Sequence, residues 1–137
     1  MKISNEEILL INALQNFSGV TARDCIISTK NILFVVNEKD VGNAIGKKGE
    51  KINKLKQKFK KNIEIYGYTE KPENFIKNSL REIKINEITE QDNEGKKIFY
   101  LNLDSENKRK IFTQTGKLKK IKELLKRNYK IDDIKIK

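Results

Sequence analysis

The spacing of hydrophobic residues in the first half of the chain predicts a helix followed by two strands. Ser4 followed by Glu7 has the form of a capping box, and apolar residues then recur at helical spacing until Ser18 and Gly19 end the pattern. The runs "DCIIS" and "ILFVV" are short and β-branched, so we expect two strands joined by a tight connection.

The same pattern continues with two helices and a third strand. Asp40 is placed to cap a one-turn helix that ends near Ile45. After two glycines, Ile52, Leu55 and Phe59 share one face of a helix of about three turns. The stretch "NIEIYGY" alternates as a strand does, so the predicted order is helix, strand, strand, helix, helix, strand.

The second half of the chain predicts the same order of elements. Pro72 is favoured in the first turn of a helix, so a new helix is expected to begin there. The stretches "EIKINEIT" and "KIFYLNL" read as strands around a turn at Asp92 to Gly95. They are followed by the Lys-rich amphipathic helix "GKLKKIKELLKRN" and the short strand "DIKI".

Sliding the sequence by about 66 residues supports an internal repeat. This offset sets Ile45 on Ile111, and it sets the apolar positions of the third helix, Ile52, Leu55 and Phe59, on Leu118, Ile121 and Leu125. We therefore expect two α+β domains, residues 1–70 and 71–137, each with a three-stranded sheet packed on helices.

The tetrapeptide Gly46-Lys47-Lys48-Gly49 joins the two central helices of the first copy. Glycine permits backbone angles that other residues avoid, and it lacks the Cβ that would hold a polynucleotide backbone away. The next helix begins at about Glu50, so its free N–H groups and positive dipole end face the same place. The residues in this loop favour contact with phosphates, to which Lys47 and Lys48 add point charges.

Residues flanking the loop extend this candidate site. Lys51 and Lys54, with Lys58, follow one flank of the helix, where they could track a strand or simply face solvent. Gly42, one turn before the loop, would let bases or the neighbouring helix approach closely.

Two other glycine motifs do not fit this loop. A nucleotide-binding P-loop would need Gly at position 41 and Ser or Thr at position 48, where the chain has Val41 and Lys48. A dinucleotide fingerprint would need Gly in place of Ala44 and a strand running directly into the loop. A plain flexible turn remains open as the alternative.

Composition narrows the function classes. The formal charge is +11, and the excess of Lys and Arg is present in both halves: 13 against 8 acidic residues up to residue 71, and 17 against 11 after it. This favours nucleic acid as a partner, although a lysine-rich composition also arises in A+T-rich genomes. The sequence has one cysteine, Cys25, and no histidine, which excludes a Cys/His zinc site. We expect no catalytic residue, no cofactor and no metal.

The stretch "VGNAIGKKGEKINKL" resembles the Ile-Gly-X-X-Gly-X-X-Ile signature of KH RNA-binding domains, and the helix-first order resembles their type II arrangement. The resemblance implies that Gly46 to Gly49 clamp the backbone of single-stranded RNA. It also implies that Ile45, Ile52 and Ile65 form an apolar groove under the bases, with Ile63 in place of Ile65 if the strand register differs. The second copy departs from the signature, because Phe112 and Thr115 stand where the offset predicts the two glycines.

Two tandem type II KH domains, the first with an intact and the second with a degenerate loop, are similar to archaeal NusA-like proteins. That resemblance implies a monomeric, cytoplasmic single-stranded RNA-binding protein that acts in transcription elongation, termination or antitermination, contacts the transcription machinery and has no membrane partner. Two alternatives remain open at this stage: an accessory protein that binds ribosomal RNA in ribosome assembly or RNA processing, and a protein-interaction scaffold that keeps the KH shape.

Overall fold

A computed structural model describes residues 4–137, and the chain divides into two compact units at the Thr69–Glu70 bond. Each unit contains one three-stranded sheet with helices. Within the described residues, no helix combines the length and the apolar composition needed to cross a bilayer.

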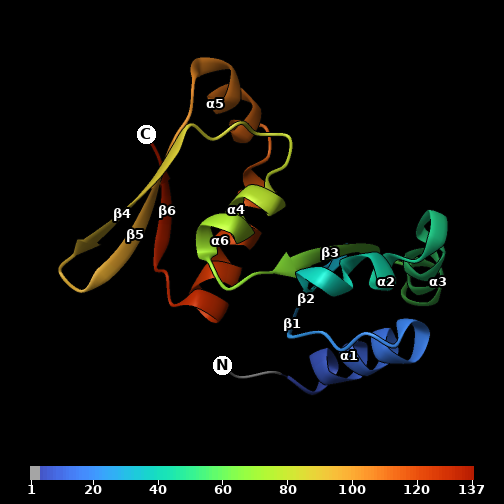
Figure 1. The fold of residues 1–137 in the computed structure, drawn as a ribbon. Helices are drawn as coiled ribbons and strands as arrows, with labels where there is room; N and C mark the ends of the chain where they lie inside the picture. The colour runs from blue at the N-terminus through green and yellow to red at the C-terminus, as the bar shows by residue number, and fades with distance from the viewer. Residues whose placement is uncertain (1–3) are drawn as a thin grey trace. The chain divides into compact units, whose positions relative to one another are not determined.

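The first unit, blue to green in Figure 1, contains one sheet with strand order β1-β2-β3. β1 and β2 are antiparallel, and β2 and β3 are parallel, so the chain crosses back over the sheet between them. That crossover carries two short helices and the glycine loop. The elements are α1 (Asn5–Ser18), β1 (Asp24–Ile27), β2 (Asn31–Asn37), η1 (Glu38–Asp40), α2 (Val41–Ile45), η2 (Lys47–Gly49), α3 (Glu50–Phe59) and β3 (Asn62–Tyr68).

The core of the first unit lies between one face of this sheet and its helices. Alternate residues of β2 share a face, and Phe34 is fully buried there. It belongs to the same cluster as Leu14 of α1, Ala44 of α2 and Leu55 of α3. The crossover helices are therefore anchored through buried side chains, and the loop between them is held from both ends.

The capping box at the start of α1 is confirmed. The Ser4 hydroxyl accepts a hydrogen bond from the Glu7 N–H at 3.2 Å, and the Ser4 N–H donates to the Glu7 carboxylate at 3.0 Å. Gly19 ends the helix in the left-handed conformation, with φ of 75°. Asp40 is the N-cap residue of the short helix that ends at Ile45, as expected. The expected capping hydrogen bond is wrong, because Asp40 lies in η1 with helical backbone angles and its side chain makes no such bond.

The second unit, yellow-green to red in Figure 1, has the same sheet topology, with strand order β4-β5-β6. β4 and β5 are antiparallel, and β5 and β6 are parallel. The rings of Phe75 and Tyr129, from the first and last helices of the unit, lie 5.3 Å apart. The elements are α4 (Pro72–Ser79), β4 (Glu87–Asn93), β5 (Lys96–Asn102), α5 (Ser105–Phe112), α6 (Thr115–Tyr129) and β6 (Asp133–Ile136).

Two boundaries in this unit differ from those predicted. Strand β4 begins at Glu87 instead of Glu82, because the Lys84 N–H donates to the Asn107 side chain at 2.9 Å rather than to a strand. The turn is also tighter than expected. Strand pairing reaches Asn93↔Lys96, and Glu94 and Gly95 both have positive φ, 55° and 86°. Two such central residues form the hairpin turn whose twist matches the flanking strands.

Candidate nucleic-acid interface

The glycine loop lies at the turning point of the crossover in the first unit. α2 ends at Ile45, the loop follows as η2, and α3 begins at Glu50 with Gly49 as its N-cap. No side chain caps the N-terminus of α3. The Glu50 N–H donates to the Lys47 carbonyl. The positive dipole end of α3 is not covered by a capping side chain and therefore faces an anion at the loop.

The loop has a backbone shape that only glycine-rich sequences adopt easily. Gly46 has φ of 82° and ψ of 170°, a region almost exclusive to glycine. Lys48 and Gly49 also have positive φ, at 55° and 73°. A Cβ on Gly46 would lie 2.9 Å from Cγ of Lys51 and 3.0 Å from the Lys51 backbone nitrogen. Glycine is thus required at position 46 both by the backbone angles and because there is no room for a Cβ.

The two lysines of the loop face solvent. Both Lys47 and Lys48 are exposed, whereas the N–H groups of the two flanking glycines are already bonded. Gly46 donates to the Gly42 carbonyl of α2 at 2.9 Å, and Gly49 donates to the Gly46 carbonyl at 3.1 Å. Among residues 4–137 the structure provides no hydrogen-bond acceptor for the N–H groups of Lys47 and Lys48. The loop therefore presents unpaired donors and two positive charges on one exposed turn.

The three isoleucines expected under the bases come from three elements. Ile45 ends α2, Ile52 lies in the first turn of α3 and Ile65 lies in the middle of β3, and all three are half-buried. Ile52 and Ile65 pack against the core of the first unit. Ile63 is 6% exposed and belongs to that core. Of the two β3 candidates, Ile65 is therefore the one with accessible surface.

The predicted lysine flank of α3 lies on the side of α1. The Lys58 ammonium lies 5.4 Å from the centre of the Phe17 ring of α1, a cation–π contact. Lys54 is one turn before it and exposed, and Lys51 is half-buried beside Gly46. Gly42 is exposed, with open space where a Cβ would be. Lys51 and Lys54 thus continue the loop toward α1.

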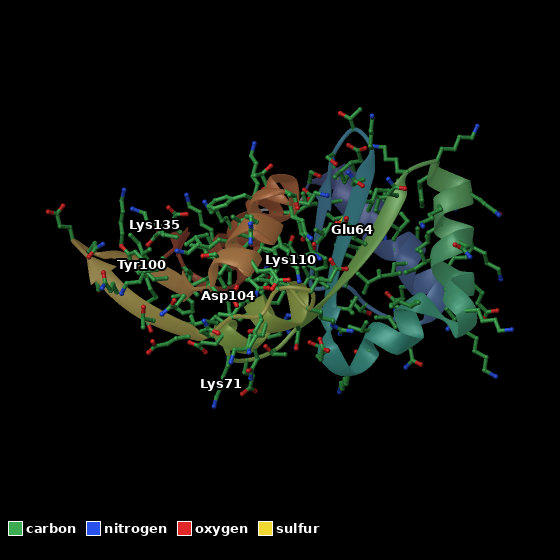
Figure 2. All side chains as sticks on the ribbon, turned by 90° about the horizontal axis from the view of Figure 1, so that it is seen from above. Glu64, Lys71, Tyr100, Asp104, Lys110 and Lys135 are labelled. Atoms are coloured by element: carbon green, nitrogen blue, oxygen red, sulfur yellow. The ribbon has the colours of Figure 1, made fainter. Side chains whose placement is uncertain are left out.

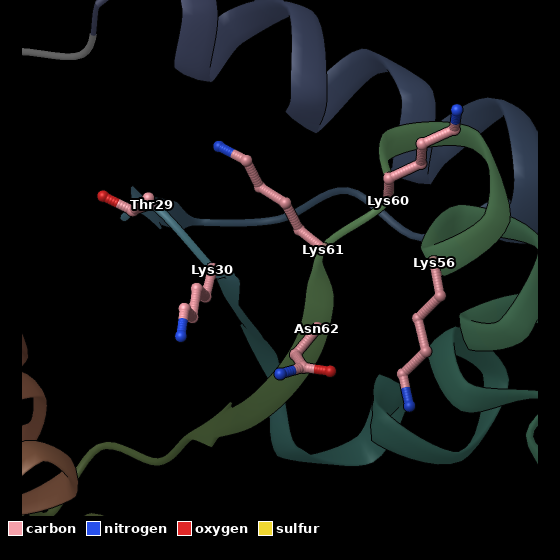
Figure 3. A pocket seen from close by; sticks show the side chains of 6 residues that line it. All are labelled: Thr29, Lys30, Lys56, Lys60, Lys61 and Asn62. Carbon is pink, nitrogen blue, oxygen red and sulfur yellow. The ribbon is translucent and has the colours of Figure 1, made fainter.

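A second group of lysines, which the sequence did not indicate, lies at the far end of α3 (Figure 3). We call it the four-lysine cluster: Lys30, Lys56, Lys60 and Lys61. Its members come from the β1–β2 turn, the end of α3 and the start of β3. The parallel register sets Asn31 opposite Asn62, and this brings Lys30 beside Lys61. A helical or strand period within one segment cannot reveal such a cluster.

The corresponding loop of the second unit has a different backbone. Gly46 and Gly49 are replaced at the 66-residue offset by Phe112 and Thr115, and none of residues 112–116 has positive φ. The N–H groups that correspond to those of Lys47 and Lys48 are both used within the turn. Thr113 donates to the Lys110 carbonyl at 3.2 Å, and Gln114 donates to the Ile111 carbonyl at 2.9 Å. Phe112 is 60% exposed.

Helix α5, which precedes this second loop, is fixed by a polar network at its start. Asp104 and Lys110 lie toward opposite ends of α5 (Figure 2). The Asp104 carboxylate accepts hydrogen bonds from the backbone N–H of Asn107 at 2.8 Å and from its side-chain amide at 2.9 Å. The backbone hydrogen bond, followed by the side-chain one, holds the pKa of Asp104 below its usual value. The residues described include no cluster of three or more metal-binding side chains.

Comparison with protein-family models matches residues 10–94, more than half of the chain, to the KH domain. The chain belongs to the KH-domain family. KH domains are RNA-binding, non-enzymatic domains, and the three-stranded sheets packed on helices described above are KH-like. The matched segment includes the whole glycine loop.

Relatives and a solved structure are similar to this chain over nearly its whole length. A protein of Methanocaldococcus jannaschii named "Probable transcription termination protein NusA" is 29% identical over 137 residues, 99% of this chain and 75% of its own. Proteins of the same name from Methanococcus vannielii and Halobacterium salinarum are 30% and 25% identical, covering 85% and 99% of this chain and 68% and 98% of their own. A crystal structure of the protein APE1850 matches with a TM-score of 0.87 at 28% identity, over 98% of this chain and 100% of that one.

Proposed function

We propose that this protein binds single-stranded RNA through the glycine loop of its first unit and acts as a transcription factor of the NusA type. One observation carries the proposal: the turn from Gly46 to Gly49 presents unpaired N–H groups and two exposed lysines beside the open N-terminus of α3. Phosphates bind to such a combination of backbone donors, dipole and charge.

In this proposal the residues around the loop have separate roles. The N–H groups of Lys47 and Lys48 hold a phosphate, and their ammonium groups neutralise it. Ile45, Ile52 and Ile65 contact the faces of the bases, which gives modest sequence preference. Gly42 leaves room for the strand beside α2, and Lys51 and Lys54 attract the backbone on the side of α1.

We assign the second unit as another type II KH domain whose loop has lost the clamp. The shared order of elements and the shared sheet topology support this assignment. The internally bonded amides of Thr113 and Gln114 explain the loss, because they leave no free donors for a phosphate. This unit then contributes, instead of a backbone clamp, a basic surface on α5 and the first turns of α6: Lys108, Arg109, Lys110, Lys117, Lys119 and Lys120.

The role in transcription rests on relatives named as probable transcription termination proteins, which match nearly the full chain. RNA crosslinking in cells tests it. A transcription factor yields nascent transcripts distributed over many genes, whereas an accessory protein of ribosome assembly yields ribosomal RNA.

RNA binding itself is tested by charge reversal in the loop. Lys47→Asp with Lys48→Asp is expected to weaken binding of a single-stranded RNA by about a hundredfold at moderate salt, since two attractive interactions with phosphates become repulsive. The matched control reverses two exposed helix lysines of the second unit, Lys77→Glu with Lys126→Glu. Circular dichroism checks that both variants are folded. Equal affinity in the folded loop variant and the control would refute the clamp.

A further inference from the structure

The four-lysine cluster lines a cavity of about 400 Å³ at the end of α3 opposite the glycine loop (Figure 3). Thr29 and Asn62 complete its lining, which contains no acidic residue. In this close-up the side chains of Lys30, Lys56 and Asn62 extend to one side, and those of Lys60 and Lys61 extend to the other. Only Lys61 among the four is half-buried, so the ammonium groups are open to a ligand from solvent.

The positive charge of this cavity is not neutralised by the protein. None of the ion pairs found in the described part of the chain includes a lysine of the four-lysine cluster. Lys61 donates only to a neutral group, the Ser28 carbonyl, at 3.1 Å. The C-terminal dipole of α3 favours cations at Lys56 and Lys60. It does not explain Lys30 and Lys61, which come from other segments.

By contrast, the lysines at the equivalent corner of the second unit are accompanied by acidic residues. There a cavity lies between the end of α6 and the starts of β5 and β6, and it is lined by three lysines together with Asp132 and Asp133. Asp133 pairs with Lys122 at 3.4 Å, and Asp132 accepts a hydrogen bond from the Lys97 N–H at 2.8 Å. The two aspartates stand at the start of β6, where the first unit has Lys61 and Asn62. The charge excess is thus particular to the first unit and not a general property of this corner of the fold.

The cavity lies along a flank of α3 that leads from the glycine loop. Ile52 and Lys56 lie one turn apart on that flank, with Gly49 directly before the helix and Lys60 directly after it. It is not the flank of Lys58, which contacts Phe17 of α1. The ten residues of α3 rise about 15 Å in total. A KH loop clamps about four nucleotides, so a longer strand has nucleotides outside the clamp, and this flank offers them a path from the loop to the cavity.

We propose that the four-lysine cluster is a second phosphate-binding site, which holds the backbone of the same single-stranded RNA beyond the glycine loop. This inference rests on RNA binding by that loop. It makes the length of RNA recognised by the first unit greater than that held by the clamp alone. The ligand is a backbone phosphate several nucleotides away from the clamped segment.

The test compares a short with a long RNA. An oligonucleotide of about four nucleotides fills the clamp, whereas one of about twelve also reaches the cavity. The cluster variant is Lys30→Gln, Lys56→Gln, Lys60→Gln, and Lys61 is kept because its side chain is bonded to Ser28. The matched control removes three lysines around the equivalent corner of the second unit: Lys96→Gln, Lys126→Gln, Lys130→Gln. Thermal melts check that both proteins are folded.

The cluster variant is expected to bind the long RNA about tenfold more weakly and the short RNA within about twofold of the unmodified protein. The slope of log affinity against log salt for the long RNA should also become shallower, by about 0.7 for each phosphate that the variant no longer neutralises. The control should leave both affinities within about twofold. Nuclear magnetic resonance titration measures the weak short complex, and fluorescence anisotropy measures the long one.

Two results would overturn the second site alone. One is a cluster variant that binds the long RNA as tightly as the unmodified protein while the Lys47→Asp, Lys48→Asp variant does not. The other is an equal decrease in affinity for the short and the long RNA, which would indicate that the lysines attract RNA only through the overall positive charge of the protein. If the loop variant binds RNA normally, the proposed function itself fails, and the second site fails with it.

Discussion

Replacing Gly46 by alanine tests whether the glycine loop is held in its observed shape. At φ of 82° and ψ of 170°, any residue other than glycine has a strain on the order of 1–3 kcal/mol. The new Cβ would also lie 2.9 Å from Cγ of Lys51, which can rotate away, and 3.0 Å from the Lys51 nitrogen, which is fixed in the first turn of α3. We therefore expect Gly46→Ala to lower the free energy of unfolding by about 2 kcal/mol or more.

Two nearby glycines provide matched comparisons. Gly49 has φ of 73°, but its Cβ would meet only the Asn53 amide at 4.0 Å. Gly49→Ala is thus expected to lower the unfolding free energy by about 1–2 kcal/mol, from the backbone alone. Gly42 lies inside α2 without positive φ and with open space around a Cβ. Gly42→Ala is therefore expected to raise it by about 0.5–1 kcal/mol, because alanine is less flexible in the unfolded chain.

Urea unfolding followed by circular dichroism measures this series. With a urea dependence of about 1–3 kcal/mol per molar, a decrease of about 2 kcal/mol lowers the midpoint by about 1 M. The expected order of midpoints, from highest to lowest, is Gly42→Ala, the unmodified protein, Gly49→Ala and then Gly46→Ala. A Gly46→Ala midpoint equal to that of the unmodified protein would refute the reasoning, because the loop would then relax at no cost.

Three further predictions concern the second unit. Asn107→Ala should lower the unfolding free energy by about 1–3 kcal/mol in urea titrations, because the Lys84 N–H loses its acceptor, and an unchanged midpoint would contradict this. The lowered pKa of Asp104 means that its stabilising effect is complete above the ordinary carboxyl pKa and is lost as pH falls through the lowered value. Melting temperatures measured from about pH 5 down to pH 2 should therefore fall less in Asp104→Asn, which keeps a capping oxygen, than in the unmodified protein. Lys130→Gly should raise the free energy of unfolding by about 1 kcal/mol, because Lys130 ends α6 at φ of 57°, where a residue with a side chain is strained and glycine is not. A thermal melt measures this, and a lower melting temperature in the variant would contradict it.

Local patterns predicted most of the fold because they act within one segment. The capping box at Ser4, the proline that begins α4 and the two strand–helix–helix–strand crossovers are each determined by neighbours in the sequence. Two predictions failed because another interaction competed with the predicted one. Asp40 has the right side chain for a cap, but the chain already turns helically before it. Strand β4 begins late because the Asn107 side chain takes a backbone donor that the strand pattern had assigned to the sheet.

The candidate site was predictable only where its residues are contiguous. The loop from Gly46 to Gly49 is four consecutive residues, so the sequence alone identifies the loop and the two lysines that it exposes. Lys30 and Lys61 are brought together by the parallel register of β2 and β3, and no single segment contains that information. Aligning "ILFVV" with "NIEIYGY" at the observed register is the signal that would have found the cluster. The constant 66-residue offset likewise breaks after the last helix, because α6 has 15 residues and α3 has 10.

The mixed pairing of each sheet also sets an order of assembly. In the first unit the antiparallel pair joins Asp24 to Val35, 11 positions along, whereas the parallel pair joins Asn31 to Asn62, 31 positions along. Closing the longer stretch has a larger entropic cost, so the hairpin is expected to form early and the third strand to dock late. The turn between the crossover helices is expected to acquire its final shape at that late step, because it lies in the stretch that the parallel pair closes. On a ribosome, the proposed RNA clamp of the nascent chain is therefore expected to form only after Tyr68 has left the exit tunnel.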